Sequence, residues 1–150
     1  MPKYSNSSKE KLSTCHFELQ LLMNYVIQFY DNTIVCGTRG KKEQTKAYNE
    51  GNSKVKYPNS KHNTIPSIAI DAAPYERTGI DWSIKQSAHF AGYVKAVADM
   101  LYKFGYMKHR VRCGADWDND NDIDDTTFWD AGHFELIPLE GEKFDNYNKN

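Results

Sequence analysis

Hydrophobic residues recur every three or four positions in two stretches of the chain, and this spacing predicts two long amphipathic helices. The first stretch covers about residues 9–30. The second begins after Ser83, a good N-cap residue, and ends at Gly105. The positions on the two apolar faces are Leu12, Cys15, Leu19, Leu22, Val26 and Phe29 in the first helix, and Phe90, Val94, Val97, Leu101 and Phe104 in the second.

Four short apolar or β-branched runs predict strands. Pro74 is expected to end the second of them, and a short polar helix over residues 41–50 should end at Gly51. Residues 52–66 have the composition of a loop. Without internal repeats or a linker, residues 1–150 are expected to form one α+β domain, with a small antiparallel sheet backed by the two long helices. The expected strands cover residues 33–36, 67–72, 111–114 and 133–137.

Composition narrows the class of protein. Hydrophobic residues make up 39% of the chain, enough for a core, and the net charge of −1 gives no general reason to expect binding to nucleic acid or membranes. No run approaches the roughly 20 apolar residues of a membrane span, and the first residues lack the apolar segment of a signal peptide. Three cysteines without a CxxC pair suggest neither a disulfide framework nor a cysteine zinc site, so Cys15 and Cys36 are interpreted as small core residues.

An acidic segment follows the third predicted strand. Its aspartates alternate along the chain, as ligands do in calcium-binding loops, but the usual glycine and final glutamate are missing. A weak calcium site and an ordinary solvated acidic loop therefore both remain open. The aspartates concerned are Asp116, Asp118, Asp120, Asp122 and Asp124.

Two of the five histidines, His62 and His133, lie where a loop meets a predicted strand and have carboxylates near them in the sequence. Asp71 lies inside an otherwise apolar strand, where an unpaired charge would be costly, so it needs a cation, a hydrogen-bond network or a metal. Asp130 precedes His133 by three residues. Catalytic zinc sites use three such ligands and leave a position for water, but this pattern alone also fits purely structural roles. The other histidines, His16, His89 and His109, are not expected to be functional.

The motifs GTRGKKEQ, SKHNTIPSIAIDAAPY, GADWD and the final D-x-x-H-F-E-L together resemble the phage-encoded L-alanyl-D-glutamate peptidases. That family is similar to the D-alanyl-D-alanine carboxypeptidases and dipeptidases of vancomycin resistance. The most specific part is S-x-H followed by A-x-D and, far downstream, an acidic residue, two further residues and His. The His62–Asp71 interval is longer than is usual in the family, and we interpret the extra length as a longer loop at Pro66-Ser67.

The resemblance implies a set of roles for individual residues. His62, Asp71 and His133 would be zinc ligands at the face of the sheet, and Asp130 would be the base that accepts a proton from the attacking water. Arg39 would steady the substrate carbonyl or the developing oxyanion. Two further positions, Ser60 and Gln44, match family residues near the substrate.

The implied function is hydrolysis of the L-Ala–D-Glu bond in peptidoglycan stem peptides by a monomeric phage lysis enzyme. Such an enzyme would be made in the host cytoplasm and reach the wall through a separate pore-forming protein, with peptidoglycan rather than nucleic acid or membrane as its partner. Two alternatives remain open: a D-Ala-D-Ala carboxypeptidase with the same site, and a non-catalytic metal module that binds walls.

Overall fold

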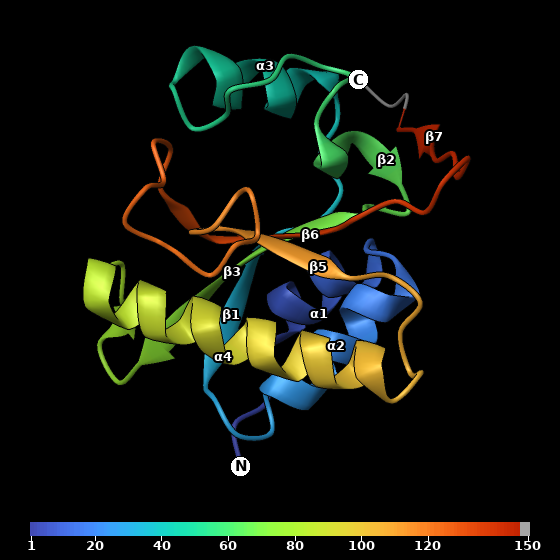
Figure 1. The fold of residues 1–150 in the computed structure, drawn as a ribbon. Helices are drawn as coiled ribbons and strands as arrows, with labels where there is room; N and C mark the ends of the chain where they lie inside the picture. Colours follow the sequence, from blue (N-terminus) through green and yellow to red (C-terminus); the bar gives the residue numbers. More distant parts are fainter. Residues whose placement is uncertain (148–150) are drawn as a thin grey trace.

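A central antiparallel sheet forms the middle layer of the computed structural model, which describes residues 1–147 (Figure 1). Neighbouring strands in the sheet run antiparallel throughout, and a short hairpin strand, β4 (Gly79–Ile80), pairs with the end of β3. The expected α+β class with a small antiparallel sheet is confirmed. The strand order is β1 (Asn32–Cys36), β3 (Ala69–Glu76), β6 (Asp130–Leu136) and β5 (Val111–Gly114).

Helices cover one side of this sheet, and smaller elements lie on the other (Figure 1). The covering helices are α1 (Asn6–Ser13), α2 (Phe17–Val26) and α4 (Ile84–Lys103). The opposite side carries α3 (Lys41–Asn49) and a two-stranded sheet of β2 (Thr64–Ile65) and β7 (Asp145–Asn146). Burial of the apolar helix faces against the sheet supplies the main stabilising term. The core includes Leu19, Leu22, Met23, Ile34, Ile70, Phe90, Val94 and Phe134.

The expectation of one long first helix is wrong, because the chain breaks between α1 and α2. There, Cys15 forms a parallel bridge with Ser67, and the His16 N–H donates to the Ser67 carbonyl at 2.8 Å. The His16 Nδ1 then accepts from the Glu18 N–H and caps α2. These contacts with a distant segment satisfy backbone groups that a continuous helix would have used internally, so only α4 is a long helix.

The second predicted strand continues past Pro74 instead of ending there. The Tyr75 N–H donates to the Asp31 carbonyl, on the β1 side of β3. Backbone N–H groups alternate between the two sides of a strand, so the backbone nitrogen of Pro74 faces the β6 side. Pairing with β6 stops at Asp71, so that edge needs no donor from residue 74. The predicted helix ending at Gly51 is confirmed, as is the strand over residues 111–114. The short strands β2, β4 and β7 were not expected.

The segment after β6 returns across the molecule and is fastened by His109. The buried His109 ring donates from Nδ1 to Glu18 Oε2 at 2.6 Å and from Nε2 to Glu142 Oε2 at 2.7 Å. Beyond Glu142, β7 pairs with β2, and the Tyr147 N–H donates to the Asn63 carbonyl. The tail is therefore tied both to the start of α2 and to the loop that follows residue 60.

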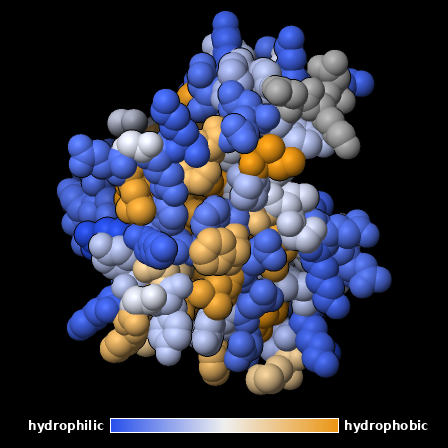
Figure 2. Space-filling view, turned by 90° about the vertical axis from the view of Figure 1, so that its right-hand side faces the viewer, coloured by the Kyte–Doolittle hydropathy of each residue, from blue (hydrophilic) through white to orange (hydrophobic). Residues whose placement is uncertain are grey.

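The side of the molecule that carries β7 is mostly hydrophilic, with hydrophobic side chains showing in small separate groups (Figure 2). Small groups of this kind are normal on a folded protein and do not indicate a large apolar interface. Within residues 1–147, none of the helices is both long enough and apolar enough to cross a membrane.

Replacing His109 with Gln should reduce stability in a pH-dependent way. Burial alone would lower the pKa of His109, but its hydrogen bonds to Glu142 and Glu18 outweigh burial and raise it. A raised pKa means that the stabilisation is fully present below the unfolded value of about 6.5 and is lost as pH rises through the folded pKa. We expect His109→Gln to lower the free energy of unfolding by about 2 kcal/mol at pH 6 and by less at pH 9.

The measurement is denaturant unfolding of both proteins at the two pH values. His89→Gln is the matched control, because His89 is exposed and bonds to the Tyr30 hydroxyl rather than to a carboxylate. A loss that is the same at both pH values would show that the charge on His109 does not matter.

Candidate metal centre

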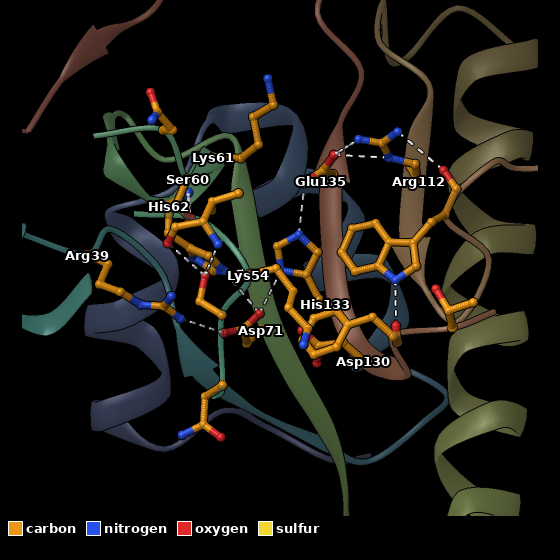
Figure 3. Close-up of a pocket in the computed structure, with 17 residues that line it drawn as sticks. Arg39, Lys54, Ser60, Lys61, His62, Asp71, Arg112, Asp130, His133 and Glu135 are labelled. Carbon is orange, nitrogen blue, oxygen red and sulfur yellow. Dashed lines mark hydrogen bonds and ion pairs between the residues drawn. The ribbon is translucent and has the colours of Figure 1, made fainter. Parts of the chain in front are cut away.

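Three side-chain donors converge in the pocket drawn in Figure 3. The antiparallel register of β3 and β6 sets Asp71 directly opposite His133. His62 comes from the short 3-10 helix η1 (Lys61–Asn63). Asp71 Oδ1 lies 3.1 Å from His62 Nε2 and 3.0 Å from His133 Nδ1, and these two nitrogens are 3.2 Å apart. The structure therefore brings together the three ligands predicted from the sequence.

The outer nitrogen of each imidazole is already engaged, and this fixes which nitrogen faces inward. His62 Nδ1 donates to the Gly37 carbonyl at 2.7 Å. His133 Nε2 donates to Glu135 Oε2 at 3.0 Å. In their neutral forms, both rings therefore present a lone pair to the space beside Asp71.

This arrangement fits a bound metal ion. Ligands at about 2.0–2.1 Å from a tetrahedral metal lie roughly 3.3 Å apart, close to the three separations observed. Two imidazole lone pairs and a carboxylate repel one another unless a cation lies between them. Burial alone would lower the pKa of His62, yet the carboxylate of Asp71 raises it to about 10. A positive charge between His62, Asp71 and His133 would therefore stabilise this set of donors.

Cys36 belongs to this centre rather than to the core, so the expectation for it is wrong, whereas Cys15 is a core residue as expected. The pairing of β1 with β3 shifts register after Ile34 and sets Cys36 opposite Asp71. Together, Cys36, His62 and Asp71 offer metal-binding atoms that all lie within 4.8 Å of one another. No periodic pattern along the chain indicates this position of Cys36, because the register shifts just before the last residue of a short strand.

Arg39 and Gln44 support the carboxylate of Asp71. Arg39 donates from Nη2 to Asp71 Oδ2 at 3.2 Å and from Nη1 to Gln44 Oε1 at 3.0 Å. Gln44 is fully buried. Ser60 has a different position: its Oγ accepts from the His62 N–H and caps η1, and the residue borders the pocket. All three residues thus lie at or near the site, with Gln44 one contact removed from the ligand.

Asp130, at the start of β6, faces the same pocket and is half-buried (Figure 3). Burial and then the nearby charge of Asp71 raise its pKa to about 6. Its position depends on a close backbone approach, because a Cβ on Gly114 of β5 would overlap the Asp130 carbonyl oxygen. A carboxyl group with a pKa near neutrality, beside a metal centre, is suited to proton transfer.

Glu135 and Arg112 are functional candidates that the sequence interpretation missed. Glu135 binds His133 through Oε2, while its Oε1 accepts from Arg112 Nε at 3.0 Å. The imidazole and Arg112 hold the pKa of Glu135 down to about 2 although burial opposes this. The available signal was the period of two in H-F-E, which puts Glu135 on the same face of β6 as His133.

The residues lining the pocket come from two walls, and the pocket encloses about 450 Å³. One wall is formed by residues 52–55 and 59–61, and the other by Trp117, Thr127, Phe128 and Asp130. On the second wall, the Trp117 ring stacks on Phe128 at 6.2 Å and lies 5.4 Å from the His133 ring. The pocket is thus a cleft with His62, Asp71 and His133 between a polar wall and an aromatic one.

The acidic segment curls on itself beside the aromatic wall. Asp116 is buried and accepts from the N–H groups of Asp120 and Asn121. Asp116, Asp118 and Asp120 offer carboxylate oxygens within 4.8 Å of one another. The remaining two of the five predicted residues, Asp122 and Asp124, are exposed, and the Asp122 carboxylate accepts from the Asp124 N–H. Three of the five aspartates are therefore brought together.

Three comparisons with known proteins agree on one family. The family model described as phage L-alanyl-D-glutamate peptidase matches residues 1–137. The L-alanyl-D-glutamate peptidase of Escherichia phage T5 is 33% identical over 140 residues, covering 90% of this chain and 98% of that protein. The crystal structure of the L-Ala D-Glu endopeptidase ChiX of Serratia marcescens has the same fold, with a TM-score of 0.68, 20% identity and 90% of each chain covered.

Replacing Glu135 with Gln should weaken metal binding while preserving the fold. The substitution keeps the shape but removes the charge that orients His133 and pairs with Arg112. We expect an affinity loss of about 10- to 100-fold, the usual effect of removing such a supporting group, and a complete loss of tight binding in His62→Ala. The measurement is competition with a chromophoric chelator, using purified protein loaded with Zn²⁺.

Glu140→Gln is the control, because Glu140 is exposed and lies outside the pocket lining. Unchanged affinity in Glu135→Gln would remove Glu135 from the support of the metal ligand.

Proposed function

The chain belongs to the phage L-alanyl-D-glutamate peptidase family, and on that premise we propose that it hydrolyses the L-Ala–D-Glu bond of peptidoglycan stem peptides during phage lysis. The observation that carries the proposal is the convergence of the His62, Asp71 and His133 donors within 3.0–3.2 Å in a pocket that also contains Asp130. A module that only binds walls would have no need for a carboxyl group of raised pKa beside the ligands.

The metal in this proposal is zinc, held by His62 Nε2, Asp71 Oδ1 and His133 Nδ1. Two imidazoles and one carboxylate are a donor set typical of catalytic zinc, with a remaining position for water or substrate. When bound, zinc would supply Lewis-acid activation of the attacking water and of the scissile carbonyl.

Asp130 is proposed as the general base and then the general acid. As a carboxylate, it would accept the proton of the attacking water, and as a carboxylic acid it would pass that proton to the amide nitrogen that leaves. A pKa of about 6 suits both roles near neutral pH, because neither form is strongly disfavoured. Its carboxyl group stays partly open to the pocket, where substrate can reach it.

Arg39 is proposed to steady the carbonyl oxygen of the scissile bond. Two of its N–H groups are used by Asp71 and Gln44, and a guanidinium has five. It borders the pocket, so the remaining donors are available to a substrate oxygen on which negative charge develops. Ser60 is proposed to contact substrate at the pocket edge, and Gln44 to act by holding Arg39.

The proposed setting is that of a monomeric lysis enzyme whose partner is peptidoglycan. We propose that it accumulates in the host cytoplasm and reaches the wall through a separate pore-forming protein. The family membership supports this setting.

We also propose a weak calcium site at Asp116, Asp118 and Asp120. Three carboxylates that share so small a volume repel one another, and a cation between them would offset that repulsion. The same segment carries Trp117 at its start and leads to Asp130, so ordering it would order one wall of the pocket.

Digestion of purified cell walls tests the proposed bond. We expect new amino termini at D-Glu and stem peptides that have lost L-Ala, detected by mass analysis of the soluble fragments. Asp130→Asn should keep the metal and the fold but lose activity by a factor of at least about 100, the usual scale for a general base. Release of free D-Ala instead would identify a D-Ala-D-Ala carboxypeptidase, and release of nothing by the metal-loaded enzyme would favour a wall-binding module.

Titration of the zinc-loaded protein with Ca²⁺ tests the calcium site. Because the loop lacks the usual glycine and glutamate, we expect a dissociation constant of about 10⁻⁴ to 10⁻³ M, and higher activity at millimolar calcium. The Asp118→Ala/Asp120→Ala double variant should lose both effects, whereas Asp122→Ala/Asp124→Ala should keep them. Equal activity of the parent protein with and without calcium would leave the segment as a solvated acidic loop.

A further inference from the structure

The pocket is lined by four cationic side chains, but two of them are already committed. Arg39 is bound to Asp71 and Gln44, and Arg112 is bound to Glu135 and to the Trp117 carbonyl. The other two, Lys54 and Lys61, form no ion pair within residues 1–147. These two lysines are therefore the pocket cations that are not already paired with a carboxylate.

Of the two lysines, Lys54 is the one that reaches across the cleft. Its Nζ lies 5.1 Å from the centroid of the Phe128 ring on the opposite wall. In Figure 3, Lys61 points away from the three metal ligands, whereas Lys54 extends toward the side of the pocket where His133 and Asp130 lie. A cation–π contact at an exposed site is weak, so the ammonium group can turn to a better partner at little cost.

The backbone of Lys54 is held in place from both sides by one buried residue. Gln44 Nε2 donates to Ser53 Oγ at 2.9 Å and to the Val55 carbonyl at 2.7 Å. The same Gln44 accepts from Arg39, which binds Asp71. Lys54 is thus positioned relative to the metal ligands by a continuous chain of hydrogen bonds, even though its own side chain is exposed.

The proposed substrate brings a negative charge to this part of the molecule. In a stem peptide, D-Glu continues the chain through its side-chain carboxyl, so its α-carboxylate is free and lies next to the scissile amide nitrogen. The pocket already contains the carboxyl groups of Asp71, Asp130 and Glu135, and Asp130 has no cationic partner within 4.0 Å among residues 1–147. A further carboxylate beside Asp130 would be repelled unless a cation accompanied it.

We infer that Lys54 is a specificity-determining residue whose ammonium group binds the free α-carboxylate of D-Glu on the leaving side of the scissile bond. This inference rests on the proposed function and adds which feature of the substrate the enzyme selects. The enzyme therefore prefers stem peptides with D-Glu over those in which the same group is a carboxamide. Lys54 binds and orients substrate and takes no part in proton transfer.

Two soluble peptides that differ only in this group test the inference. Both contain acyl-L-Ala linked to a γ-joined D residue, which is D-Glu in one and D-isoglutamine in the other. For Lys54→Met, we expect kcat/KM on the D-Glu peptide to fall by about tenfold, mainly through KM, as for loss of a hydrogen bond to a charged group. The carboxamide peptide should change by less than about twofold, and Lys54→Arg should restore most of the preference.

Lys56→Met is the matched control. Lys56 lies on the same segment and also sits 5.1 Å from an aromatic ring, that of Tyr48, but it does not line the pocket. We expect this variant to behave as the parent enzyme on both peptides. An equal loss on both peptides in Lys54→Met, or no loss on either, would overturn the role of Lys54. Failure of the parent enzyme to cleave either peptide would instead overturn the proposed function, and the role of Lys54 with it.

Discussion

The register between β3 and β6 is the constraint on which the site depends. It sets Asp71 opposite His133 and Ala69 opposite Glu135, and the next pairing sets Arg112 of β5 opposite Glu135. Alternate residues of a strand face opposite sides, so these polar groups share one face while Phe134 and Leu136 face the helices. A slip of one residue would bury His133 in the core and expose the core residues, so apolar packing enforces the geometry of the site.

At this face of the sheet, each buried carboxylate is paired with imidazole and guanidinium groups. Asp71 uses one oxygen for the two imidazoles and the other for Arg39, while Glu135 divides its oxygens between His133 and Arg112. Within residues 1–147, every buried side-chain nitrogen and oxygen has a hydrogen-bond partner. Removing one member would leave its partner charged and desolvated, which costs more than the pair itself contributes. The network therefore favours one arrangement of the ligands over alternatives.

Local sequence patterns predicted the elements that neighbouring residues determine. They missed the features that contacts with distant residues determine. The spacing in α4 and the alternation around Asp71 were enough to find a helix and a buried carboxylate. The break at Cys15 depends on Ser67, and the place of Cys36 depends on a register shift against β3, so neither has a local signal. His62 and His133 were found because each stands near a carboxylate in the sequence, but their closeness to each other came only from the resemblance to a family. Arg112 was missed because its partner, Glu135, lies 23 residues away.

The two walls of the cleft are joined to the central strands by different chains of contacts. On the polar wall, the backbone beside Lys54 is held through Gln44 and Arg39 to Asp71. On the aromatic wall, the Phe128 carbonyl accepts from Trp117 Nε1–H, and the Trp117 carbonyl accepts from Arg112, which also binds Glu135. A carboxylate that replaced the Phe128 ring as the partner of the Lys54 ammonium group would break neither of these chains of contacts. The inferred selection by charge therefore requires only a movement of the Lys54 side chain, at the small cost of a weak cation–π contact.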